Sequence, residues 1–241
     1  MEEGKYLETD KGTPQGGVLS PILANIYLHY ILDLWFEGKV KRQLKGFAQL
    51  VRYADDFIVC FQYENEANAF GEVLRQRLSK FGLRIAEEKS RTIEFGRHAL
   101  EKAHRQGEKV ATFDFLGFTH YCDKTRRGKF KLGRKTAKSK FRQEMKVMNQ
   151  WLKDVRNLVK LAEWWQVLGK KLIGHYQYYG ISGSMQALKR YYIGTLRLAY
   201  KWINRRSQRR SCNWEQFCCF LEHNPLPQPR IYHLTYTLSS H

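Results

Sequence analysis

The sequence predicts an α+β fold, in which antiparallel hairpins with helices are followed by an all-α bundle. Up to about residue 132, short runs of alternating apolar residues are interleaved with amphipathic helical periods. From about residue 138, apolar residues recur at helical spacing, and the chain has no proline between Pro21 and Pro225. The balance of charged residues also changes between the two halves of the chain. Residues 1–122 hold 17 Lys+Arg against 17 Asp+Glu, whereas residues 123–241 hold 25 against 6.

The chain first shows a glycine-containing segment, GTPQGGVLSP (12–21), that leads into a helix. Its glycines allow a sharp turn or a close approach of the backbone to a ligand. Ser20 followed by Pro21 predicts an N-cap with proline at the first helical position. Apolar residues then recur at helical spacing from Ile22 to Leu34, so we expect the helix to end near Glu37, before Gly38.

A hairpin is predicted next, with strands at 47–52 and 57–61 and Tyr53-Ala54-Asp55-Asp56 at its tight turn. Further elements follow in order: an amphipathic helix over 70–81 closed by Gly82, a strand or hairpin over 83–95, a polar loop over 96–109, and a second hairpin over 113–121 and 130–132.

Asp55 and Asp56 are the first candidate metal-binding and catalytic residues. Adjacent carboxylates repel, but a hairpin turn can aim several of their oxygens at one point, which suits Mg²⁺. Paired metal ions stabilise the attacking and leaving oxygens in phosphoryl transfer. A solvent-facing turn without a function remains the alternative.

The second half predicts a helical bundle that binds a polyanion. Helices are expected over 141–159, 164–179 and 185–204. The candidate cations for binding a nucleic acid are Lys138, Arg142 and Lys146, on or just before the first of these helices, and Arg205, Arg206, Arg209 and Arg210 at a helix end. Arginine forks match phosphate geometry, and segregated positive charge is typical of nucleic-acid binding. A solvated charge run is the alternative. The aromatic cluster 175–179 could stack bases or pack the bundle.

The five cysteines show neither CxxC nor zinc-site spacing, and Cys218-Cys219 lies in an apolar helical stretch, so we expect free thiols in a reducing interior. No apolar run reaches the length of a membrane span, and no signal-peptide pattern is present. These features predict a cytoplasmic protein of bacterial type, or an organellar one, with no membrane partner.

Four blocks in order carry a resemblance: GTPQGGVLSPILANIYL (12–28), YADDFIV (53–59), GLRIAEEKSRTIEFG (82–96) and FDFLGF (113–118). They resemble consecutive blocks of the reverse transcriptases of mobile group II introns. KLIGHYQYYGISGSMQALKRYY (171–192) and PLPQPRIYH (225–233) resemble the thumb or maturase region that follows. The resemblance implies a partial polymerase palm at 1–122, a helical thumb/maturase domain at 123–205, and a basic, proline-containing segment at 206–241 without an endonuclease domain.

The resemblance also implies roles for individual residues. Asp55 and Asp56 would be catalytic, metal-binding carboxylates with Mg²⁺ as cofactor. The nucleotide- and template-binding residues would be Gln15, Gly16, Gly17, Tyr53, Ala54 and Lys89, and the primer grip would be Leu116, Gly117 and Phe118. An exposed strand lysine remains the alternative for Lys89, as does ordinary core packing for Leu116 and Phe118. Structured intron RNA, with a DNA primer, would be the partner.

One family block is not found in this sequence: the first catalytic aspartate, on a palm strand upstream of the glycine loop. Asp10, Asp33 and Asp114 do not replace it, so the metal-ligand set is incomplete and the enzymatic status stays open. The hairpin should then have an open edge. We expect another chain, in a homo-oligomer or as a second polypeptide, or an unusual local rearrangement to cover it. Three hypotheses follow: a reverse transcriptase and maturase for RNA-templated DNA synthesis, splicing and mobility; a polymerase-inactive RNA-binding maturase or assembly subunit; and a half-polymerase completed by another chain.

Overall fold

A computed structural model describes residues 19–206 and 211–234 and divides the chain into two compact units, Met1–Glu94 and Phe95–His241. Small antiparallel sheets precede a helical region, which confirms the predicted fold class. The predicted domain limits at residues 122 and 205 stay predictions.

The first unit begins with one nearly continuous helical run. It comprises α1 (Ser20–Leu28), the π-helical turns η1 (His29–Asp33) and η2 (Phe36–Val40), and α2 (Lys41–Gln43). Two expectations were wrong: Leu19, not Ser20, is the N-cap, and the helix does not end at Gly38. The buried side chains of Phe36 and Val40 explain the second error, because their packing extends the helix through the glycine.

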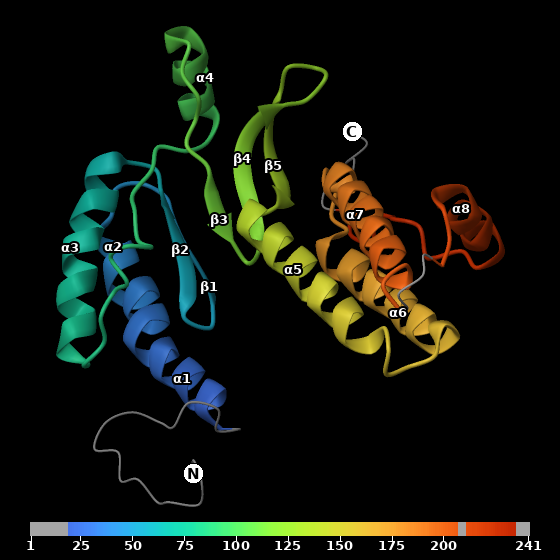
Figure 1. Ribbon diagram of the computed structural model, residues 1–241. Coiled ribbons are helices and arrows are strands. Elements are labelled where there is room, and N and C mark those ends of the chain that lie inside the picture. Colours follow the sequence, from blue (N-terminus) through green and yellow to red (C-terminus); the bar gives the residue numbers. More distant parts are fainter. Residues whose placement is uncertain (1–18, 207–210, 235–241) are drawn as a thin grey trace, which may run out of the picture. The chain divides into compact units, whose positions relative to one another are not determined.

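A β-hairpin lies beside these helices (Figure 1). Strands β1 (Ala48–Tyr53) and β2 (Asp56–Phe61) pair antiparallel with Tyr53 opposite Asp56, and α3 (Glu64–Lys80) follows. Gly82 has a φ of +69° just after α3, as its predicted role in closing that helix requires. The core of the unit consists of Ile31, Leu32, Phe36, Val40, Ala48, Phe70, Leu74 and Leu78.

Two apolar surfaces of the first unit are exposed. Helix α1 has no buried residue, and its exposed side chains include Ile22, Leu23, Ile26 and Tyr27. Val51 and Tyr53 are exposed on β1 as well. Within the described ranges β1 and β2 form a two-stranded sheet, so each strand has one unpaired edge there, as the hairpin prediction expected.

The second unit begins with a short helix and a three-stranded antiparallel sheet. Helix α4 (Arg97–Gln106) precedes strands β3 (Phe113–Phe115), β4 (Phe118–Lys124) and β5 (Phe130–Thr136), which pair in that order. The loop predicted for 96–109 was therefore wrong, because Ala99 and Ala103 bury one face of a helix that Gly107 closes at a φ of +69°. The strand predicted for 83–95 was also wrong, since these residues form turns and irregular structure.

Four helices complete the described part of the second unit. They are α5 (Lys138–Val155), α6 (Leu161–Tyr179), α7 (Met185–Ile203) and α8 (Trp214–His223) (Figure 1). Their core is rich in aromatic side chains, with Trp164, Tyr176 and Phe217 each about 1% exposed. The predicted helices of this region are confirmed, with somewhat different ends.

The segment after α8 packs on the bundle. The indole of Trp165 donates to the carbonyl of Asn224, the Tyr176 hydroxyl donates to the carbonyl of Pro227, and Leu226 is buried. All five cysteines are free, as expected. None of the helices within the described ranges is long and apolar enough to cross a membrane.

Candidate functional site

The Tyr53–Asp56 turn exposes two carboxylates at the end of the β1–β2 hairpin. Asp55 and Asp56 are both exposed, and no hydrogen bond or ion pair within the described ranges engages either carboxylate. Ala54 precedes them with a φ of +53°, a backbone conformation that costs a residue with a Cβ about 1 kcal/mol. The turn therefore holds two acidic side chains without internal partners on a strained backbone.

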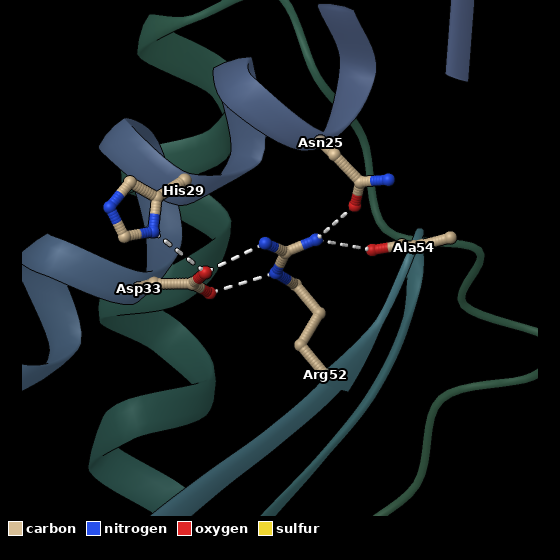
Figure 2. Close-up of polar contacts among 5 residues, drawn as sticks. All are labelled: Asn25, His29, Asp33, Arg52 and Ala54. Carbon is tan, nitrogen blue, oxygen red and sulfur yellow. Dashed lines mark hydrogen bonds and ion pairs between the residues drawn. The ribbon is translucent and has the colours of Figure 1, made fainter. Parts of the chain in front are cut away.

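Arg52 fixes the backbone of this turn (Figure 2). Successive residues of β1 alternate between a half-buried face and an exposed face, and Arg52 belongs to the half-buried face, which lies against the helical run. One terminal nitrogen donates to the Ala54 carbonyl at 2.8 Å and to the Asn25 side-chain oxygen at 2.9 Å. The other two nitrogens grip Asp33 in a fork, with distances of 2.7 and 2.8 Å. The strained turn is thereby tied to α1 and η1.

The Asp33–Arg52 pair is well shielded for an ion pair near a surface, with side-chain exposures of 26% and 13%. Hydrogen bonding from Arg52 lowers the pKa of Asp33, and the same bond raises the pKa of Arg52. His29 adds a contact from Nδ1 to Asp33 at 3.2 Å. Because Arg52 occupies both Asp33 oxygens, Asp33 serves as an anchor for the turn, and this agrees with its exclusion as a third metal ligand.

A second strained turn, at Leu116-Gly117, joins β3 to β4. Leu116 and Gly117 have φ values of +50° and +79°, the pattern of a type I′ turn, with Phe115 opposite Phe118. The hydroxyl of Tyr178 on α6 donates to the Leu116 carbonyl at 3.1 Å, and the Ala137 amide donates to the Gly117 carbonyl at 2.9 Å. Both turn carbonyls are thus held.

The aromatic rings of α6 also support this turn. The Phe118 ring stacks on Tyr178 with centroids 5.9 Å apart and lies 5.5 Å from Tyr179. Ala54 and Leu116 are the two non-glycine residues with positive φ in the part of the chain that is described. Each carbonyl accepts a hydrogen bond from a side chain, so the surrounding structure holds both strained turns in place.

Most of the other predicted binding residues are either exposed or lie outside the described part of the chain. Lys89 is exposed in an irregular turn, two residues after Glu87, which binds Arg75. Lys138, Arg142 and Lys146 are exposed at four-residue spacing on α5, so they share one face of that helix. Gln15, Gly16, Gly17, Arg209 and Arg210 lie outside the described residues, as does Asp10.

Arg205 and Arg206 make contacts within the protein. Arg205 lies over the Trp202 ring at 5.7 Å, and Arg206 donates to the Val159 carbonyl at 3.5 Å. Their side chains therefore pack on the bundle as well as adding positive charge.

The aromatic cluster at the end of α6 is mostly core. His175, Tyr176 and Tyr179 are buried, whereas Tyr178 is 55% exposed. The His175 ring stacks on Tyr191 with centroids 3.5 Å apart, and burial lowers the pKa of His175 to about 4. Packing, one of the two roles considered for this cluster, accounts for all of it except Tyr178.

The donor set at the Tyr53–Asp56 turn fits Mg²⁺ in part. No group of three or more His, Cys, Asp or Glu side chains suited to a metal ion occurs within 19–206 and 211–234. Mg²⁺ nevertheless binds many nucleotide sites through one or two carboxylates together with substrate phosphates and water. Asp55 and Asp56 supply that minimum.

Comparisons with known proteins place part of this sequence in a known family. Residues 1–120 match the family model described as reverse transcriptase (RNA-dependent DNA polymerase). A segment of 41 residues is 51% identical to the group II intron-encoded protein LtrA of Lactococcus lactis subsp. cremoris, and equally to that of strain MG1363. The segment covers 17% of this chain and 7% of the length of the relative.

Proposed function

This chain belongs to the reverse transcriptase family, and from that premise we propose that it takes part in RNA-templated DNA synthesis of the group II intron type. The observation that carries the proposal is the Tyr53–Asp56 turn, which holds two carboxylates without a partner among the described residues, on a backbone fixed by Arg52. The group II intron-encoded relative supports the subtype. The proposal also includes the roles in splicing and mobility that the sequence resemblance implies.

Asp55 and Asp56 would hold Mg²⁺, which would supply positive charge against the phosphates of the incoming nucleotide and activate the attacking hydroxyl. Arg52 holds the turn so that both carboxylates keep their direction. Tyr53 and Ala54 flank the nucleotide, and Lys89 adds a positive charge for the triphosphate. Structured RNA binds the cations of the second half, Lys138, Arg142 and Lys146 among them.

The Leu116–Phe118 turn is the proposed primer grip. Its carbonyls are already hydrogen-bonded to Tyr178 and Ala137, so the turn is rigid before any nucleic acid binds. Rigid placement of a reacting end lowers the entropic part of a barrier. The free thiols of all five cysteines support a reducing compartment such as the bacterial cytoplasm for this chemistry.

The test is primer extension on an RNA template with Mg²⁺ by this chain. A double variant, Asp55→Asn with Asp56→Asn, removes both charges, and Asp154→Asn with Glu163→Gln removes two exposed carboxylates on α5 and α6 as a control. Extension that is lost only in the first variant supports the proposal. Extension that persists in that variant at the wild-type rate contradicts it.

A second candidate function is an RNA-binding subunit that another chain completes. The exposed apolar side chains of α1 and the exposed Val51 and Tyr53 of β1 favour it, because such surfaces are usually covered. Absence of extension by the purified chain, together with salt-sensitive RNA binding, would favour this candidate. Light scattering then distinguishes a homo-oligomer from a chain that needs a different partner.

A further inference from the structure

The hairpin formed by β4 and β5 carries the densest positive charge of the described residues outside the helices. Seven of the thirteen residues from 123 to 135 are Lys or Arg, and one is acidic. At its tip, Lys124, Arg126, Arg127 and Lys129 are all exposed. We name the end of the β4–β5 hairpin that carries these four residues (124–129) the basic hairpin. None of them belongs to the α5 face or to the arginine cluster at 205–210.

The tip of the basic hairpin is ordered by its own hydrogen bonds. The Thr125 amide donates to the Lys129 carbonyl at 2.8 Å, and the Gly128 amide donates to the Thr125 carbonyl at 2.9 Å. Gly128 has a φ of +77°, which a glycine adopts without strain. The cations are therefore presented from a fixed turn, so binding an anion costs little backbone entropy.

Among the described residues, the side chains of the basic hairpin form no ion pair. The ion pairs among residues 19–206 and 211–234 engage Lys41, Arg52, Arg75 and two histidines, and none involves the hairpin. Four cations within six residues repel one another, and that repulsion is relieved when an anion with several charges binds.

Helix α4 extends this cationic surface. The Sγ atom of Cys122 on β4 lies 3.3 Å from the Gly96 amide, at the start of α4, and α4 packs against β4. An open hollow of about 360 Å³ is lined by Glu101, His104, Arg105 and Lys124. Arg105 thus adds a guanidinium to the hollow that Lys124 of the hairpin lines, in which Glu101 is the acidic residue.

We propose that the basic hairpin, with Arg105, binds the sugar–phosphate backbone of structured RNA. The minor groove of an RNA helix is wide and shallow, so a narrow two-stranded ribbon laid across it brings its cations toward the flanking phosphates. RNA helices are recognised chiefly through phosphates, hydroxyls and shape, which needs no base-specific side chain. The tip, KTRRGK (124–129), has no apolar side chain to enter a lipid bilayer, so a membrane surface fits less well. This inference rests on the proposed RNA-binding function and adds a site to it.

The test compares two variants that lose the same charge. The hairpin variant carries Arg126→Gln, Arg127→Gln and Lys129→Gln. The control carries Arg42→Gln, Arg84→Gln and Lys39→Gln, three exposed cations of the first unit. Affinity for a labelled stem–loop RNA is measured over a series of KCl concentrations, and circular dichroism verifies that each variant is folded.

We expect the hairpin variant to reduce the slope of log K against log salt by about 2 to 3, and to bind roughly 100-fold more weakly at physiological salt. The control should match the wild type. Equal losses in the two variants, or a hairpin variant that binds as the wild type does, would overturn the inference. So would unchanged RNA binding with lost binding to phosphatidylserine vesicles. A wild-type chain without salt-sensitive RNA binding would instead refute the proposed function itself.

Discussion

Replacing Arg52 should loosen the turn that carries Asp55 and Asp56. Arg52→Ala removes the fork on Asp33 and the bond to the Ala54 carbonyl, and leaves Asp33 partly buried with His29 alone. Hydrogen bonds to charged groups contribute about 1.5–3 kcal/mol, and a fully buried broken pair costs about 3–5 kcal/mol. Because this pair is partly exposed, we expect the free energy of opening the hairpin to fall by about 2 kcal/mol.

Hydrogen exchange of β1 and β2 is the suitable assay, because it measures the free energy of opening this hairpin separately from that of the rest of the chain. A loss of about 2 kcal/mol corresponds to exchange roughly 30-fold faster at Ala48–Phe61. Arg52→Lys keeps the charge but not the fork, and should fall between the wild type and Arg52→Ala. The exposed Arg75→Ala is the control and should leave exchange of β1 and β2 unchanged.

A double-mutant cycle with Asp33→Asn tests the reasoning itself. If Arg52 acts through Asp33, the two changes are coupled by about 1–2 kcal/mol. Effects that add within about 0.5 kcal/mol would refute this account of the turn. Since the pKa of Asp33 is lowered, its contribution exists above its ordinary value of 3.8 and is lost as the pH falls through the lower folded value. Asp33→Asn should therefore remove part of the destabilisation of the hairpin below about pH 4.

Two further predictions concern the second unit. Tyr178→Phe removes the hydrogen bond from the hydroxyl to the Leu116 carbonyl but keeps the ring, and the loss of about 1 kcal/mol should raise the Kd for primer–template about fivefold. The control Tyr63→Phe, at an exposed tyrosine, should leave this Kd unchanged. Equal Kd values for Tyr178→Phe and the wild type would contradict the role of Tyr178. His175 has a pKa of about 4 when folded and 6.5 when free, so the unfolded state binds more protons between these values and the bundle loses stability as the pH falls from 6.5 to 4. The loss should reach about 3 kcal/mol by pH 4. It should be absent in His175→Phe, measured by denaturant unfolding followed by tryptophan fluorescence, and an unchanged pH profile would contradict this assignment.

The sequence predicted well wherever a strong pattern coincided with local turn chemistry. The hairpin around Ala54 and Asp55 was anticipated within one residue at the turn, because alternating apolar residues flank it on both sides. The bundle helices followed from long apolar seams, and the structure buries Met148 and Leu152 of the seam on α5.

Weak or misleading patterns explain the errors. Helix α4 was predicted as a loop because its buried face consists of Ala99 and Ala103, which carry little hydrophobic signal among charged neighbours. The alternation over 83–95 predicted a strand, yet a strand forms only when a neighbour pairs with it, and the pattern does not show pairing.

The support of the turn was missed for a similar reason. Arg52 sits at an inward position of an apolar strand, a place where an unpaired charge would be costly, and this was the available signal. Identifying Asp33 and Asn25 as its partners required the spatial arrangement of helix and hairpin. Likewise, the link from Tyr178 to Leu116 joins residues 62 positions apart, which spacing in a single sequence does not reveal.

The most direct test of the central claim asks whether a divalent ion binds at the turn that Arg52 holds. Mn²⁺ replaces Mg²⁺ in the presence of primer–template, and paramagnetic broadening of backbone amide signals locates the ion. We predict selective broadening at Tyr53–Phe57 that Mg²⁺ reverses and that the double variant Asp55→Asn with Asp56→Asn lacks. Broadening confined to other carboxylates, with the turn unaffected, would contradict the assignment of this turn as the catalytic metal site.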